Sequence, residues 1–245
     1  MAVKARLDGH AFDLDTLCEL FAAGDPQVNK ESDGLYYLAS CELDGLIDDA
    51  GPLVETASLL LRRVVGVARA LDSSFRPVTL TSQFTDDSGG GKRHHVVAAA
   101  TMEIRARMSA TGVVTAADQS PPPPPPPPQG PMYMELIKAH ADVAEVLDIL
   151  GRPSVSMTWV DLYKVYEIVR HNVGSDKALK GKGWVPDSDI SAFTGSANRP
   201  DVSGSEARHA RLPGAFPKRT MTLAEGEAFI RTLVVAWWDS LSPSS

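Results

Sequence analysis

Apolar and polar residues alternate with a period of two in several stretches of the first 110 residues, which is typical of β-strands. Residues 3–8 alternate in this way, residues 35–39 form a short apolar and aromatic run, and residues 78–83 alternate again. Turn-forming residues then fill 86–92, and a long alternating arm covers 96–108. The pattern predicts strands and a hairpin, although alanine, methionine, glutamate and arginine in the long arm leave a helix as the alternative.

Two helices are expected between these strands. Asp13 is a suitable cap for a short helix that ends before Gly24, and Pro52 suits the first turn of a longer helix reaching Leu71. In the longer helix, apolar residues recur every three or four positions, so one face should cover the sheet. Residues 1–110 are therefore predicted to form an α+β domain with a mixed or antiparallel sheet and two helices.

Eight consecutive prolines, Pro121 to Pro128, interrupt the chain. Each ring fixes φ and removes an amide donor, so the run should form a semi-rigid polyproline II segment. We expect a linker over residues 111–130 that holds two separately packed bodies apart. Recognition of the run by the aromatic groove of a partner is the functional alternative.

Helical periodicity dominates residues 131–245. One broad apolar face runs from Pro131 to Leu150, Thr158 can cap a second helix, and Thr222 with Glu225 forms a capping box for a third. The connection over residues 175–221 is too long to lack structure or function, and a short helix is expected near residues 187–193. The predicted fold class is α+β: a sheet domain, a polyproline linker and a C-terminal α-helical bundle.

Composition narrows the functional classes. The 245 residues are 43% hydrophobic and 22% charged, with a formal net charge of −7, so the whole molecule has no general attraction for phosphate backbones or anionic lipid. Only two cysteines occur, Cys18 and Cys41, which argues against a disulfide framework or a cysteine zinc site. With no signal peptide or membrane span in the pattern, we expect a cytoplasmic protein, and the alanine and valine content suggests a bacterial source.

The main candidate site combines charged residues of one predicted helix with residues of the long connection. Glu167, Arg170 and His171 lie within about one helical turn of each other. Two sets follow in the connection: Arg208 and His209 as further catalytic candidates, and Asn198, Arg199 and Arg211 as ligand-binding candidates. Glu167 could contact His171 and raise its pKa. The two interpretations are a polar clamp between loop and helix, and a site for phosphate chemistry with His209 as general acid and base.

Several runs in the C-terminal part resemble uncharacterised bacterial proteins of the HEPN-like helical type. These runs are residues 159–167, 197–200 and 204–210. The resemblance implies a helical bundle and a defence or toxin–antitoxin setting, with phage defence as one case. HEPN families include ribonucleases in which a histidine follows an arginine by four to six residues. Because Arg208 and His209 are adjacent, both a non-catalytic bundle and a metal-independent ribonuclease stay open.

Other motifs predict no cofactor or metal. The run 89–92, Gly-Gly-Gly-Lys, lacks the leading glycine and the following serine or threonine of a phosphate-binding loop. The six histidines show no metal-ligand spacing.

Trp237 and Trp238 point in different directions on a helix, so one should be exposed. We therefore expect a protein partner or a homodimer through the C-terminal helix, with RNA as an alternative partner.

Overall fold

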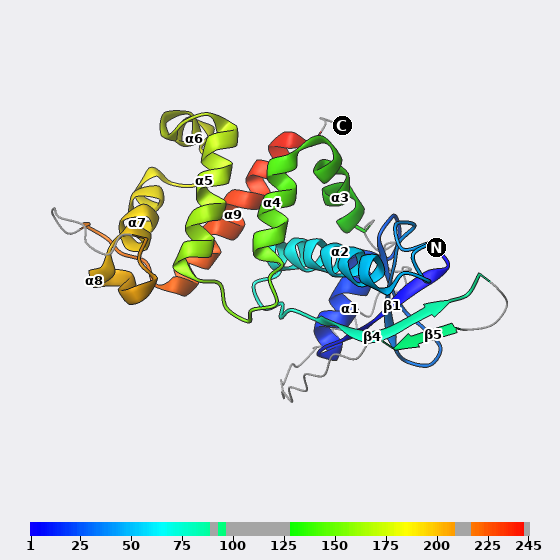
Figure 1. The fold of residues 1–245 in the computed structure, drawn as a ribbon. Coiled ribbons are helices and arrows are strands. Elements are labelled where there is room, and N and C mark those ends of the chain that lie inside the picture. The colour runs from blue at the N-terminus through cyan, green and yellow to red at the C-terminus, as the bar shows by residue number, and fades with distance from the viewer. Residues whose placement is uncertain (89–92, 97–127, 209–216, 243–245) are drawn as a thin grey trace, which may run out of the picture.

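The computed structural model describes residues 1–88, 93–96, 128–208 and 217–242. It confirms the α+β class: a five-stranded sheet at one end of the molecule and helices over the remainder (Figure 1). Among the described residues, no helix combines the length and the apolar character that a membrane span requires.

The sheet has the strand order β2-β3-β1-β4-β5, and every pairing is antiparallel. The strands are β1 (Val3–Asp8), β2 (Gln27–Lys30), β3 (Tyr36–Ala39), β4 (Thr79–Asp86) and β5 (Arg93–Val96). β4 and β5 form the predicted hairpin, with Phe84 opposite His95. The rest of the long alternating arm, residues 97–108, lies outside the described residues.

The two predicted helices are both present, and the longer one packs on the sheet as predicted. α1 (Ala11–Leu20) contacts β2, and α2 (Ala50–Leu71) contacts β4. The side chains of β1 alternate between buried and partly exposed, and Val3, Ala5 and Leu7 are buried. His10 caps α1 in place of Asp13, because Asp13 is buried inside the first turn and accepts a hydrogen bond from the Arg76 amide at 2.9 Å.

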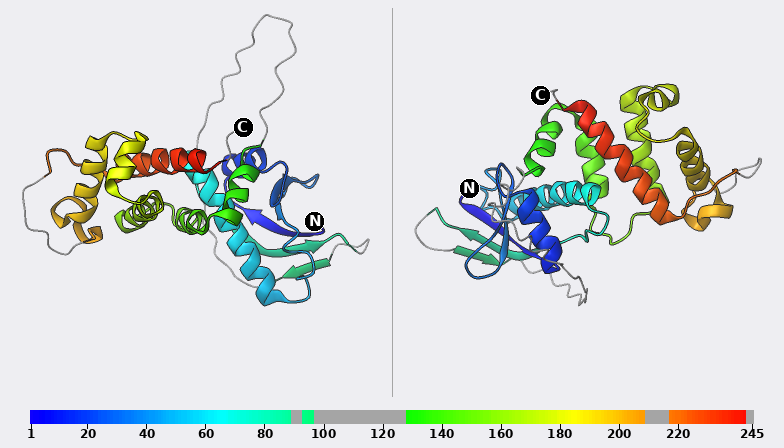
Figure 2. Two further views of the ribbon diagram at one scale, coloured as in Figure 1. Left: turned by 90° about the horizontal axis from the view of Figure 1, so that it is seen from above. Right: turned by 180° about the vertical axis from the view of Figure 1, so that it is seen from behind.

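The helical part extends from α2 away from the sheet and gives the molecule an elongated shape (Figures 1 and 2). Its helices are α3 (Gly130–Ala139), α4 (Ala141–Leu150), α5 (Trp159–Val173), α6 (Asp176–Lys182), α7 (Asp187–Asn198), α8 (Pro200–Ser203) and α9 (Leu223–Leu241), with a 3-10 turn at Gly204–Glu206. The predicted capping boxes at Thr158 and Thr222 are both present.

Two expectations for these helices are wrong. The single helix expected from Pro131 to Leu150 is broken at His140, whose φ of −133° and ψ of 100° are extended. The apolar face continues across the break, which is why periodicity alone did not reveal it. Trp237 and Trp238 are both fully buried, since α9 is packed on more than one side by α2, α3, α5 and α7. No exposed tryptophan on α9 therefore supports a dimer, which stays a prediction.

Buried side chains from both sides of the proline run form one continuous core. It extends from Val3 in β1 to Trp238 in α9, and α2 packs along α4 and also contacts α3 and α9. The separate packing expected for the two parts is therefore not found. Residues 111–127 of the predicted linker, with seven of its prolines, lie outside the described residues, so the domain boundaries stay predictions.

Close backbone contact between α2 and α4 explains why these helices share a core. A β-carbon on Gly66 of α2 would lie 2.6 Å from the carbonyl oxygen of Leu147. A β-carbon on Gly151, which ends α4, would overlap the carbonyl oxygen of Arg62. Both positions require glycine because any side chain would force the helices apart.

Candidate functional site

Arg208 forms the contact that joins the long connection to α5. Its Nη2 lies 3.1 Å from Oε1 of Glu167, and its guanidinium carbon lies 4.7 Å from the ring centroid of Tyr163. The Arg208 side chain is 43% exposed and that of Glu167 is 34% exposed, so the pair lies at the surface. Of the candidate catalytic residues that are described, these two are the ones brought together.

Backbone contacts hold this segment in place. The Arg208 amide donates to the carbonyl of Ala197 in α7 at 2.9 Å. The Glu206 carboxylate accepts a 3.4 Å hydrogen bond from the amide of Trp159, at the beginning of α5, where free amides and the helix dipole favour an anion. The segment is therefore docked between α5 and α7.

Arg170 and His171 do not join this contact. Arg170 lies 3.6 Å from the carboxylate of Asp176, which also accepts a 3.2 Å hydrogen bond from the hydroxyl of Tyr166. Burial, reinforced by the nearby Asp176 charge, raises the pKa of Tyr166. His171 is exposed and, among the described residues, has no ion pair with Glu167. The contact predicted between Glu167 and His171 is replaced by the Glu167–Arg208 pair.

The predicted ligand-binding residues are turned toward the protein. The Arg199 side chain is buried and binds Asp201 in a bidentate manner, with Nε and Nη2 each 2.9 Å from a carboxylate oxygen. Asn198 donates from Nδ2 to the carbonyl of Thr194 at 2.8 Å. His209 and Arg211 lie outside the described residues, so their predicted roles are not tested.

A charged groove that the sequence did not reveal lies beside Glu167. It has a volume of about 440 Å³ and lies between α2, α4 and α5. Its cationic lining residues are Arg62, Arg152 and Lys164, and its acidic ones are Glu145, Asp148 and Glu167. Arg152 is paired with Asp161. Apart from Arg152, which follows α4, the charged residues come from the polar faces of three helices, and helical periodicity identifies such faces but not which of them will meet.

The groove offers charge of both signs but no evident metal site. Among the described residues, no group of three or more histidine, cysteine, aspartate or glutamate side chains is placed to hold a metal ion. The volume falls within the range of small-molecule and peptide sites. Its lining is polar and carries charge of both signs.

Comparisons with known proteins give no family. The chain matches no family model, no curated protein and no solved structure.

Proposed function

We propose that this protein is a non-catalytic accessory or interaction protein. In this proposal its helical part is a HEPN-like bundle, and the protein acts in a bacterial defence or toxin–antitoxin setting. The observation that supports it is the pairing of arginines in the candidate site. Arg208 pairs with Glu167, Arg170 with Asp176 and Arg199 with Asp201.

This pairing disfavours phosphate chemistry. A phosphate that approached Arg208 would have to displace the Glu167 carboxylate, which would then repel it. Catalytic arginines stabilise the transition state best when they are preorganised and free to meet developing negative charge. A clamp needs the opposite arrangement, with each guanidinium neutralised by a carboxylate of the same chain.

The groove is the surface that we assign to the partner. Three cationic and three acidic side chains line it, so it complements a protein surface of mixed charge better than a uniformly anionic polymer. If so, Arg62→Glu with Lys164→Glu should abolish recovery of the natural partner by affinity purification. Lys30→Glu with Lys138→Glu makes the same change in net charge at exposed positions elsewhere and should retain it.

An RNA cleavage assay combined with unfolding measurements tests the main proposal. We expect the wild type, Arg208→Ala and His209→Ala to leave total RNA equally intact and to be equally harmless on expression. Arg208→Ala should lower the free energy of unfolding by about 1 kcal/mol, because an exposed ion pair and a cation–π contact are lost. In a double-mutant cycle with Glu167→Gln, the coupling should be about 0.5 kcal/mol.

A matched control is Arg219→Ala, which removes a surface ion pair with Asp189 outside the candidate set. We expect it to cost no more than about 0.5 kcal/mol. RNA cleavage by the wild type that is lost in both Arg208→Ala and His209→Ala, at unchanged stability, would establish the ribonuclease instead.

A further inference from the structure

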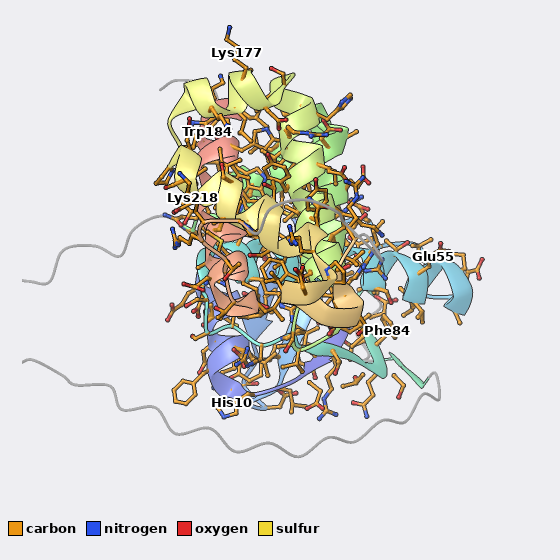
Figure 3. The ribbon with its side chains drawn as sticks, turned by 90° about the vertical axis from the view of Figure 1, so that its left-hand side faces the viewer. His10, Glu55, Phe84, Lys177, Trp184 and Lys218 are labelled. Atoms are coloured by element: carbon orange, nitrogen blue, oxygen red, sulfur yellow. The ribbon has the colours of Figure 1, made fainter. Side chains whose placement is uncertain are left out.

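The end of the molecule formed by α6 carries lysines for which the described part of the chain supplies no paired carboxylate. Lys177, Lys180 and Lys182 of α6 are exposed, as is Lys218 before α9. Lys177, Lys218 and Trp184 appear on the same side of the molecule in Figure 3. Two of the nearby acids are engaged with arginines, since Asp176 meets Arg170 and Asp189 meets Arg219, and a third, Asp187, is exposed in the first turn of α7.

The charge of this end is opposite to that of the whole chain. Between residues 170 and 184 there are four lysine or arginine residues and one acidic residue, although the formal net charge of the protein is −7. Lysines near the C-terminus of α6 are also favoured by the helix dipole, which accounts for Lys180 and Lys182 in structural terms. The dipole does not account for Lys177 in the first turn or for Lys218 on a separate segment.

An aromatic ring accompanies these charges. Trp184 is half-buried, whereas Trp159, Trp237 and Trp238 are buried. Gly183 has a φ of +66°, which turns the chain after α6 so that the Lys182 ammonium lies 5.5 Å from the centroid of the Trp184 ring. A partly exposed aromatic ring beside cations is the arrangement that stacks a nucleic-acid base while the cations bind the adjoining phosphates.

We propose that α6, Trp184 and Lys218 form a binding site for single-stranded nucleic acid. The lysines would bind successive phosphates, and the indole of Trp184 would stack on a base that a duplex keeps inside its own stack. A membrane surface fits less well, because the apolar side chain of α6, Leu179, is buried toward the core. The site does not include Arg208 or Glu167, so it goes beyond the proposed non-catalytic role and does not depend on it.

Fluorescence anisotropy with a labelled single-stranded oligonucleotide of about 20 nucleotides tests the site. We expect a Kd on the order of 10 µM at moderate salt, and a slope of log K against log salt near −3 if about four phosphates are contacted. Lys180→Glu with Lys182→Glu should weaken binding about tenfold or more and reduce the magnitude of the slope by about 1.4. Binding to the duplex of the same sequence should be weaker.

Lys30→Glu with Lys138→Glu is the matched control, since it changes the net charge equally away from α6. Its affinity should stay within about twofold of the wild type, because salt screens distant charges. Tryptophan fluorescence gives a second readout: the oligonucleotide should quench the wild type, and Trp184→Phe should remove the quenching because the other three indoles are buried. Melting curves should show each variant folded.

Three results would overturn the site. The first is an equal loss of affinity in the two double variants, which would indicate a general charge effect. The second is quenching that persists in Trp184→Phe, which would place the bound bases elsewhere. The third is binding to vesicles of phosphatidylglycerol and phosphatidylcholine without binding to the oligonucleotide, which would assign the lysines to a lipid surface.

Discussion

Arg69 is a charged side chain in the interior of the protein. It is 8% exposed, and its guanidinium donates to the carbonyls of Leu150, Arg152 and Val155 at 2.9, 3.1 and 3.2 Å and also to that of Ser154. Burial lowers the pKa of Arg69 to about 10, so the side chain is still charged at neutral pH. One residue of α2 thereby fixes the loop that connects α4 to α5.

Replacing Arg69 should be costly because four carbonyls would lose their donor. We expect Arg69→Met to lower the free energy of unfolding by about 3 kcal/mol, and Arg69→Lys to recover only part of this because an ammonium cannot reproduce the planar fork. Urea unfolding measures both. Arg231→Met is the control: Arg69 and Arg231 both line a small cavity of about 40 Å³, and Arg231 has no ion pair among the described residues. A similar loss in the control would show that Arg69 has no special role.

The candidate site shows what residue-level analysis could and could not foresee. Glu167 and Arg208 were both selected from the sequence, and the structure brings them together. Their relation was not predictable, because the path of the connection depends on α7 and on Glu206 at the beginning of α5. The groove was missed for a similar reason: Arg62 and Lys164 belong to helices that meet only after folding.

At the scale of elements, the crossing of α2 and α4 depends on glycine. Gly151→Ala should lower the free energy of unfolding by about 2 to 3 kcal/mol, because the new methyl group would overlap the Arg62 carbonyl and the helices would have to separate. Chemical denaturation monitored by circular dichroism measures the change.

Gly181→Ala is the control for this substitution. A β-carbon at Gly181 in α6 would meet no atom within 4 Å. Since alanine favours helices, we expect this substitution to raise the free energy of unfolding by about 0.5 to 1 kcal/mol. A Gly151→Ala protein as stable as the wild type would show that α2 and α4 can move apart at little cost.

The elements that the sequence predicts well are those with strong periodicity and explicit end signals. β1, α2, α5 and α9 fall within a few residues of their predicted positions, and the last two begin at the predicted capping boxes. β2 was missed because it has four residues, of which only Val28 is buried. Its formation depends on pairing with β3, which no local pattern encodes.

Because one continuous core joins the residues on both sides of the proline run, we expect the whole molecule to fold as one unit. Cutting the chain at a protease site inserted after residue 111 should leave residues 1–111 and the remainder associated, because α2 contacts α3, α4 and α9. Gel filtration of the cleaved protein should give a single peak that contains both pieces. Two separate peaks under native conditions would instead support independent domains.

At this scale the sequence suggested separate packing of the two parts, which the structure does not have. A proline run fixes the local conformation of the chain but carries no information about tertiary contacts. Stiffness along residues 121–128 suggested separation. The amphipathic pattern of α2 predicted a helix over the sheet but did not show that the same helix is buried widely enough to hold α4 as well. The burial of α2 on two sides depends both on its own sequence and on the sequences of the helices that follow the proline run.

The shared surface of α2 and α4 also has an evolutionary consequence. A β-carbon at Gly66 would meet the carbonyl oxygen of Leu147, and one at Gly151 would meet that of Arg62, and no substitution in the facing helix removes a backbone carbonyl. We therefore expect glycine to be kept at both positions in related lineages. Natural selection would then preserve the fit of the two helices together, although more than 70 residues separate their contact positions along the chain.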